Sequence, residues 1–110
     1  MIWLDEDVLP LARVLASLRD DVAHPPGEPD SAWLVITRDR RIEEHRARIA
    51  DVIEHRRKLV VLTGLDAGGT WGQLEVVLTQ WRAIEALARQ DGPFIHAATR
   101  SGLRPVPLRA

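Results

Sequence analysis

Carboxylates follow two separate apolar segments of this 110-residue chain. Asp5, Glu6 and Asp7 come directly after the apolar amino-terminal residues, and Asp39 comes just beyond the apolar segment 33–37. In an open parallel sheet, ligands bind outside the carboxyl ends of the strands, so two strands that end in acids predict one shared acidic pocket. Carboxylates that lie together repel each other. The pattern therefore predicts a site for a cation.

Magnesium is a cation that suits these groups. Mg²⁺ takes oxygen ligands in octahedral geometry and is commonly held by one or two carboxylates together with a substrate phosphate, which Asp5 and Asp39 would allow. The ion would lower the pKa of a water and stabilise charge on the attacked phosphate, so a phosphodiester would be hydrolysed without a protein nucleophile. Arg38, Arg40 and Arg41 would then guide the nucleic-acid backbone, because guanidinium groups match phosphate geometry.

Each of these features has a simpler structural interpretation. Acids at a strand end often cap the next helix, and Asp7 is a candidate for that role. An arginine cluster is often a solvated helix face. Asp66 follows the apolar segment 59–62 and is a candidate for a further carboxylate at the same edge of the sheet. The four histidines show no i,i+4 pair, so no transition-metal site is expected among them.

Short apolar runs alternate with amphipathic segments along the chain. We predict strands at 1–4, 21–24, 33–37, 59–62 and 94–98, with an extended tail at 103–108. Helices are predicted around apolar positions 8–18, around apolar positions 42–53, and over 71–90, the last behind a capping box of Thr70 and Gln73. Strands that alternate with helices predict a three-layer α/β domain with a small, mainly parallel central sheet flanked by helices.

Length and composition indicate a single globular domain. The chain is 45% hydrophobic, which is ample for one core, and its net charge is −1. Residues 1–30 carry seven acids against two arginines, whereas residues 38–58 carry eight cationic side chains against five acids. There is no cysteine, which excludes disulfides and thiolate metal sites. No signal peptide or membrane span is expected, and we predict a cytoplasmic protein.

Several of these segments together resemble the PIN-like domains, especially the short-chain branch of toxins in VapBC-type toxin–antitoxin pairs. The most specific element is Thr37-Arg38-Asp39 at the end of a strand. The acids that precede the first helix, the segment 60–64, the helix around Trp81 and the segment 93–102 are also similar to that branch. The likeness covers most of the chain and implies a single PIN-like domain over residues 1–110.

The resemblance implies a metal-dependent ribonuclease. PIN domains hydrolyse RNA with Mg²⁺ or Mn²⁺ held by clustered carboxylates. Matched residue by residue, Asp5 and Asp39 stand at metal-ligand positions and are the expected catalytic residues. Asp7 stands where the branch often has an asparagine, and Thr37 stands where a hydroxyl steadies the site. The expected metal ligands are Asp5, Asp39, Asp7 and Asp66.

The resemblance also implies partners. The expected substrate is RNA, bound through Arg38, Arg40 and Arg41, and the expected protein partner is a small antitoxin that covers the acidic pocket. Self-association through the helix at 71–90 would give a homodimer.

The chain departs from the family between the second and third strands. PIN-like chains normally have a helix there that carries another acid, whereas only residues 24–32, with three prolines and a glycine, are available here. A full helix does not fit, so low activity is expected, and a PIN-like domain kept only for binding a partner is the main alternative. Asp30 is expected to lie outside the site, because a five-residue strand of about 17 Å separates it from Asp39.

A receiver-type signalling domain is the other alternative. Such domains also gather acids at strand ends around Mg²⁺, and they use a threonine, here Thr63, together with a lysine. No lysine follows the final predicted strand, which argues against a receiver.

Overall fold

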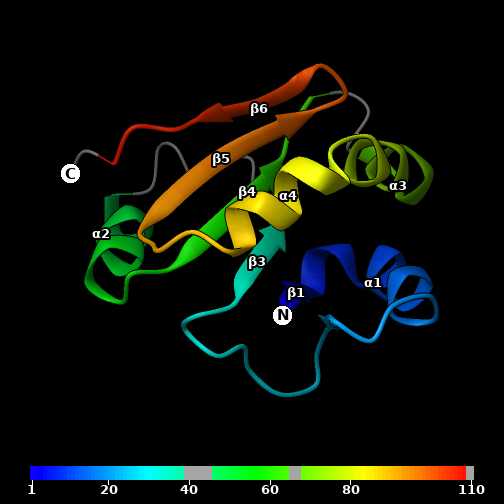
Figure 1. Cartoon of the computed structure of the whole chain (residues 1–110), viewed down its shortest axis with the longest axis horizontal. Coiled ribbons are helices and arrows are strands. Elements are labelled where there is room, and N and C mark those ends of the chain that lie inside the picture. The colour runs from blue at the N-terminus through cyan, green and yellow to red at the C-terminus, as the bar shows by residue number, and fades with distance from the viewer. Residues whose placement is uncertain (39–45, 65–67, 109–110) are drawn as a thin grey trace.

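A computed structural model describes residues 1–38, 46–64 and 68–108 of the chain. It is an α/β structure in which strands and helices alternate (Figure 1). The strands are β1 (Ile2–Leu4), β2 (Val22–Ala23), β3 (Leu34–Thr37), β4 (Lys58–Leu62), β5 (Phe94–Thr99) and β6 (Gly102–Pro105). The helices are the short 3₁₀ helix η1 (Glu6–Val8) and the α-helices α1 (Leu9–Ala16), α2 (Arg46–Glu54), α3 (Thr70–Thr79) and α4 (Trp81–Ala88).

The six strands form one sheet in the order β2-β1-β3-β4-β5-β6. All neighbouring pairs are parallel except β5 and β6, which are antiparallel. The prediction of a mainly parallel sheet between helices is therefore confirmed. The tail expected at 103–108 begins as an edge strand, because the turn at residues 100–101 brings Leu103 opposite Ala98.

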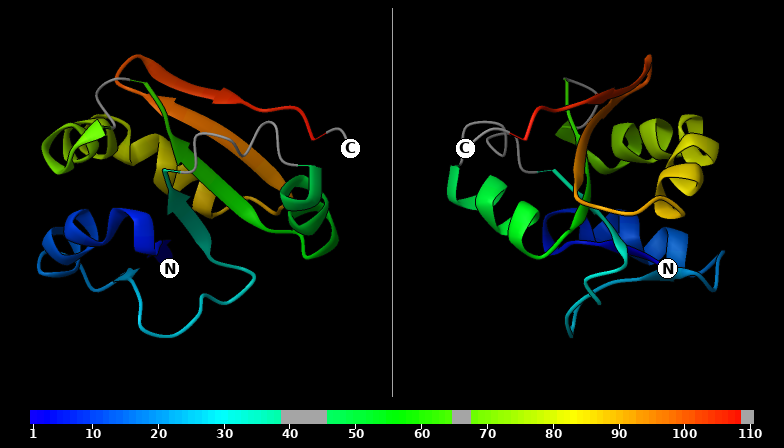
Figure 2. Two further views of the ribbon diagram at one scale, coloured as in Figure 1. Left: turned by 180° about the vertical axis from the view of Figure 1, so that it is seen from behind. Right: turned by 60° about the vertical axis from the view of Figure 1, so that its left-hand side comes forward.

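The two faces of the sheet carry different layers of helix. Alternate strand residues point to opposite faces, so Leu4, Ile36 and Leu62 pack with α1, α3 and α4, while Trp3 and Val61 pack with α2. We call the first side the three-helix face and the second the α2 face. Figure 2 (right) shows α2 on one side of the sheet and α3 and α4 on the other.

The connection from β4 to β5 has the opposite hand from the other crossovers. The steps β3 to β4 and β4 to β5 run in the same direction across the sheet, yet α2 crosses on one face and α3 with α4 cross on the other. The step from β1 to β2 runs the other way on the three-helix face, so it shares its hand with the α2 crossover. Because about 98% of such crossovers are right-handed, the β4–β5 connection is the left-handed exception.

Among the described residues, the α2 face therefore carries α2 and the crossing from β2 to β3. Three helices share the opposite face, and the chain crosses from β2 to β3 on the α2 side without forming a helix, as the prolines predicted. Residues 24–33 contain no helix and no strand. Trp33 at the end of this crossing packs on Trp3, with 6.3 Å between ring centroids. Space between this loop and α2 is therefore left over the sheet.

The prediction of one helix over 71–90 is wrong, because this segment forms the two helices α3 and α4. It is interrupted at Gln80, where the side-chain amide donates to the backbone oxygens of Thr99 and Arg100 at 3.1 and 3.0 Å. These contacts with the turn after β5 coincide with the break between α3 and α4. The predicted capping box is also wrong, because Gly69 is the N-cap of α3 and no side chain caps it.

Helix α1 is shorter than the apolar pattern over positions 8–18 predicted. Leu11 and Leu15 are buried, whereas Val14 is 42% exposed and Leu18, beyond the helix end, is 72% exposed.

In the described segments, no helix combines the length and apolar composition needed to cross a membrane.

Candidate functional site

The strands β1 and β3 meet at the point where the sheet changes direction. Helix α1 leaves β1 over the three-helix face, and α2 follows β3 on the other face, so the carboxyl ends of these two strands form a topological switch point. In doubly wound sheets with this strand order, ligands bind at that switch point. The backbone N–H of Asp5 donates to the carbonyl of Ile36 at 3.0 Å, which extends the β1–β3 pairing to the site.

Asp7 links the turn after β1 to the end of β3 at this switch point. Its Oδ2 accepts a hydrogen bond from the hydroxyl of Thr37 at 2.8 Å and another from the backbone N–H of Arg38 at 3.1 Å. Thr37 is 1% exposed, whereas Asp7 is exposed, so a buried hydroxyl at the end of β3 holds an acid from the turn after β1. The structure thus brings together Asp7 and Thr37, which the resemblance assigned to one site.

The capping role considered for Asp7 belongs to Asp5 instead. Oδ1 of Asp5 accepts the N–H of Glu6 at 2.9 Å and caps the 3₁₀ helix η1. Asp7 lies inside that helix, so its side chain reaches outward to β3 rather than back along its own turn. The capping interpretation of Asp7 is therefore wrong. Within the described residues, Oδ2 of Asp5 and Oδ1 of Asp7 have no hydrogen-bond partner, so each acid keeps one oxygen available.

Several predicted site residues lie outside the described part of the chain. These are Asp39, Arg40, Arg41 and Asp66. Arg38 is described, and only its backbone N–H takes part in the contacts at Asp7. Among the described residues, no three histidine or acidic side chains are grouped so as to hold a metal ion. A metal site at Asp5 and Asp7 would therefore require a further ligand, and Asp39 is the next residue in the sequence after Arg38.

The chemistry of this donor set favours a hard cation. Asp5, Asp7 and the sequence candidates Asp39 and Asp66 offer carboxylate oxygens only, which suit Mg²⁺ or Mn²⁺ rather than zinc or copper. One oxygen on each of Asp5 and Asp7 is already fixed by hydrogen bonds. The side chains are therefore oriented by the fold before any ion arrives.

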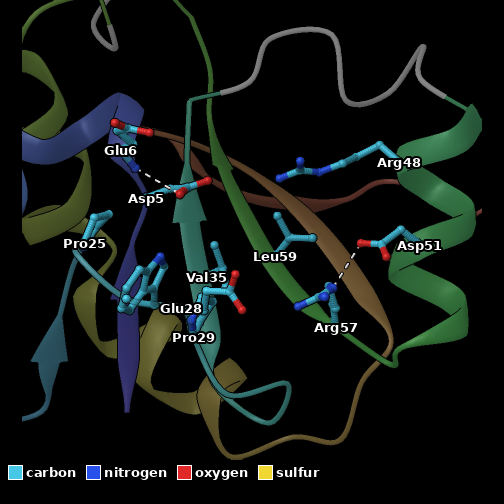
Figure 3. A pocket seen from close by; sticks show the side chains of 12 residues that line it. Asp5, Glu6, Pro25, Glu28, Pro29, Val35, Arg48, Asp51, Arg57 and Leu59 are labelled. Carbon is cyan, nitrogen blue, oxygen red and sulfur yellow. Dashed lines mark hydrogen bonds and ion pairs between the residues drawn. The ribbon is translucent and has the colours of Figure 1, made fainter.

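A pocket of about 430 Å³ adjoins the switch point on the α2 face. Asp5 and Glu6 lie at one end, and Trp3, Val35 and Leu59 of three neighbouring strands form its floor. The loop 25–29 makes one wall, and side chains of α2 make the other (Figure 3).

Among the described residues, the cations on this wall are Arg48 of α2 and Arg57, which lies between α2 and β4. Arg57 is held by Asp51, whose Oδ2 accepts from Nε of Arg57 at 3.0 Å, while Oδ1 of the same carboxylate lies 2.9 Å from Nδ1 of His55. Both oxygens of Asp51 are therefore engaged. Arg48 has no ion pair or hydrogen bond with any part of the chain that the structure describes, and Figure 3 shows it extending over the pocket toward the side where Asp5 lies.

Sequence reasoning did not find this pocket. Glu28, Arg48 and Arg57 lie in different segments and meet only because the loop 25–29 and α2 cover the same face of the sheet. No local pattern carries that information. Asp30, by contrast, does not line the pocket, and its Oδ1 accepts the N–H of Ala32 at 2.8 Å in the turn before β3.

Comparisons of the chain with protein-family models, with curated proteins and with solved structures found no match. Its function is therefore argued from the site itself.

Proposed function

We propose that this chain is a PIN-like ribonuclease that hydrolyses RNA phosphodiester bonds with Mg²⁺ or Mn²⁺ at the β1–β3 switch point. The observation that carries the proposal is the contact of Asp7 with Thr37 and Arg38. It joins the acidic turn after β1 to the Thr-Arg-Asp segment that begins at the last residue of β3, and these are two of the segments on which the resemblance rests. Asp5 lies in the same turn and pairs with β3 through its backbone.

The chain's own residues have distinct roles in this proposal. Asp5, Asp7 and Asp39 hold the cation, with Asp66 as a further ligand. The hydroxyl of Thr37 and the N–H of Arg38 fix one oxygen of Asp7 and leave the other for the ion. When bound, the ion supplies a water of lowered pKa and stabilises charge on the phosphate. Arg38, Arg40 and Arg41 contact backbone phosphates, which positions RNA without reading its sequence.

The receiver-type alternative is favoured by one observation, the strand order 2-1-3-4-5 of the parallel strands, which flavodoxin-like and receiver-type sheets share. Two others argue against it. Right-handed crossovers would place the β3–β4 and β4–β5 helices on the same face, whereas here they lie on opposite faces. The residue after β5 is Arg100 rather than a lysine. Labelling with acetyl phosphate would reveal a receiver.

A binding module without catalysis is the alternative that the short β2–β3 connection favours. No helix carries an acid into the site from residues 24–33. Activity, if present, depends on a small set of carboxylates, and we expect it to be low.

The first test is cleavage of single-stranded RNA by the purified chain in Mn²⁺. We expect divalent-dependent cleavage that Asp5→Asn lowers at least about a hundredfold, because one of few metal ligands is lost. Asp20→Asn is the matched control, since Asp20 is an exposed acid in the turn after α1. Absence of cleavage, or equal cleavage by Asp5→Asn, would favour the binding module.

We further propose that the nuclease is the toxin of a toxin–antitoxin pair, with a small antitoxin covering the acidic end of the pocket. The support is the resemblance to that branch of the PIN-like domains. Expression of the chain alone should stop growth, and co-expression with a small protein encoded beside it should restore growth. If no such protein copurifies or restores growth, the toxin assignment fails while the nuclease assignment stands.

A further inference from the structure

Among the described residues that line the pocket, Arg48 is a cation without an ion pair or hydrogen bond. Its nearest acid along α2 is Asp51, but His55 and Arg57 occupy both oxygens of that carboxylate. Arg48 also forms no ion pair with Asp5 across the pocket, so the two charged groups face each other with space between them (Figure 3). Within the described segments, Arg48 is therefore an unpaired cation directed over a cavity beside the candidate metal ligands.

The pocket has the size and lining of a small-ligand site. Its volume of about 430 Å³ lies within the roughly 300–1,000 Å³ typical of such sites. Trp3, Val35 and Leu59 form an apolar floor, and Pro25 and Pro29 add apolar surface on the loop wall. Charged groups lie around this apolar centre. A ligand with one flat apolar part and one anionic part matches this lining.

The charges fix which way such a ligand lies. Glu6 and Glu28 on the β1 and loop side repel an anion, and Arg57 is neutralised by Asp51. Among the described side chains of the pocket, Arg48 is thus the unpaired cation that can attract a phosphate, and guanidinium groups bind phosphate through paired N–H donors. The flat part is then directed toward the two prolines and the floor.

We propose that this pocket binds one nucleotide of single-stranded RNA, with its phosphate on Arg48 and its base against Pro25 and Pro29. The choice of RNA as the source of the nucleotide rests on the proposed function. The pocket shares Asp5 with the candidate metal centre, so a nucleotide held there is next to the phosphodiester that the cation would activate. Arg48 is thus a substrate-binding residue additional to the arginines after β3.

The test is a titration with nucleotides, which needs no cleavage. The four tryptophans give four indole N–H signals in a proton–nitrogen NMR spectrum. Trp3 lies in the pocket floor, whereas Trp71 is 73% exposed on α3 on the other side of the sheet and reports non-specific effects. Cytidine 5′-monophosphate in Mg²⁺ should shift the Trp3 signal and leave the Trp71 signal in place.

Two variants and a nucleoside identify the phosphate contact. Arg48→Ala should weaken binding of the nucleotide about tenfold, as expected for one lost charge-assisted hydrogen bond. The same variant should leave binding of cytidine, which has no phosphate, unchanged. Arg82→Ala is the control, because Arg82 is exposed on α4 at the three-helix face. It should bind the nucleotide as the wild type does.

The outcomes separate this inference from the proposed function. No shift of Trp3, or an equal affinity for Arg48→Ala and wild type, overturns the nucleotide site even if the protein cleaves RNA. A shift of Trp3 by argininamide in place of the nucleotide also overturns it, and indicates a basic peptide as the ligand. Nucleotide binding that depends on Arg48 in a protein that cleaves no RNA supports the site and overturns the nuclease.

Discussion

At the scale of single residues, the site depends on a contact between Asp7 and Thr37, thirty positions apart in the chain. The position of Asp7 after the first strand predicted that it lies at the acidic edge of the sheet, and the resemblance to PIN-like domains implied that Thr37 belongs to the same site. The sequence did not predict which acid caps the turn and which reaches across to β3. That difference arises because Glu6–Val8 is a 3₁₀ helix, which directs neighbouring side chains differently from an α-helix.

Replacing Thr37 by valine tests this contact. Valine keeps the shape of the buried side chain and removes the hydroxyl that Asp7 accepts from. We expect the free energy of unfolding to fall by about 1 kcal/mol, since water replaces part of the bond at the exposed carboxylate. Urea unfolding measures the change. Thr79→Val, at an exposed threonine at the end of α3, is the control, and an equal change in both variants would show that Thr37 does not hold Asp7.

His96 predicts a dependence of stability on pH. Burial lowers the pKa of His96 in the folded state, and its Nδ1 has no hydrogen-bond partner in the described structure. Above the pKa of about 6.5 that a histidine has in the unfolded chain, the side chain is neutral in both states. There it does not make the free energy of unfolding depend on pH. As the pH falls from there toward the lower folded pKa, only the unfolded chain takes up the proton, so stability is lost across that window.

The measurement compares urea unfolding of the wild type and His96→Gln at several pH values from neutral to mildly acidic. The wild type should lose more stability on acidification than the variant, which has no titrating group on β5. A variant that loses as much stability as the wild type would place the pH dependence elsewhere.

At the scale of elements, apolar runs and prolines located the strands and the irregular β2–β3 crossing. The interruption between α3 and α4 was not predicted, because nothing near Gln80 disfavours a helix. The interruption coincides with a tertiary contact: the Gln80 amide donates to the carbonyls of Thr99, the last residue of β5, and of Arg100 in the turn that follows. The residues around Gln80 do not reveal this contact, because its two sides lie about twenty positions apart in the sequence.

Gln80→Leu should therefore destabilise the chain. The substitution leaves two backbone carbonyls without their side-chain donor. We expect the free energy of unfolding to fall by about 1–2 kcal/mol, and by less if water replaces the lost donor at these carbonyls. Gln90→Leu is the matched control, since the side chain of Gln90 is exposed beyond the end of α4. Chemical unfolding of the two variants should give different midpoints, and identical midpoints would mean that Gln80 does not anchor the helix junction.

At the scale of the whole molecule, the arrangement of the layers creates the candidate site. The sequence predicted a mainly parallel sheet, but strand order and crossover hand depend on packing that no short segment encodes. The left-handed β4–β5 connection places α3 and α4 beside α1, and in the described segments the other face carries α2 and the loop 25–29. The pocket beside Asp5 is the space between that loop and α2.

The central claim is that carboxylates at the switch point hold a divalent cation. Calorimetric titration with Mn²⁺ tests it most directly. Asp7→Asn is the informative variant, because an amide oxygen still accepts from Thr37 and Arg38 while the negative charge is lost. We expect the wild type and Asp20→Asn to bind Mn²⁺, and Asp5→Asn, Asp7→Asn and Asp39→Asn to bind it much more weakly with unchanged melting temperatures. Absence of binding heat in the wild type, or equal heats in all five proteins, would contradict the account.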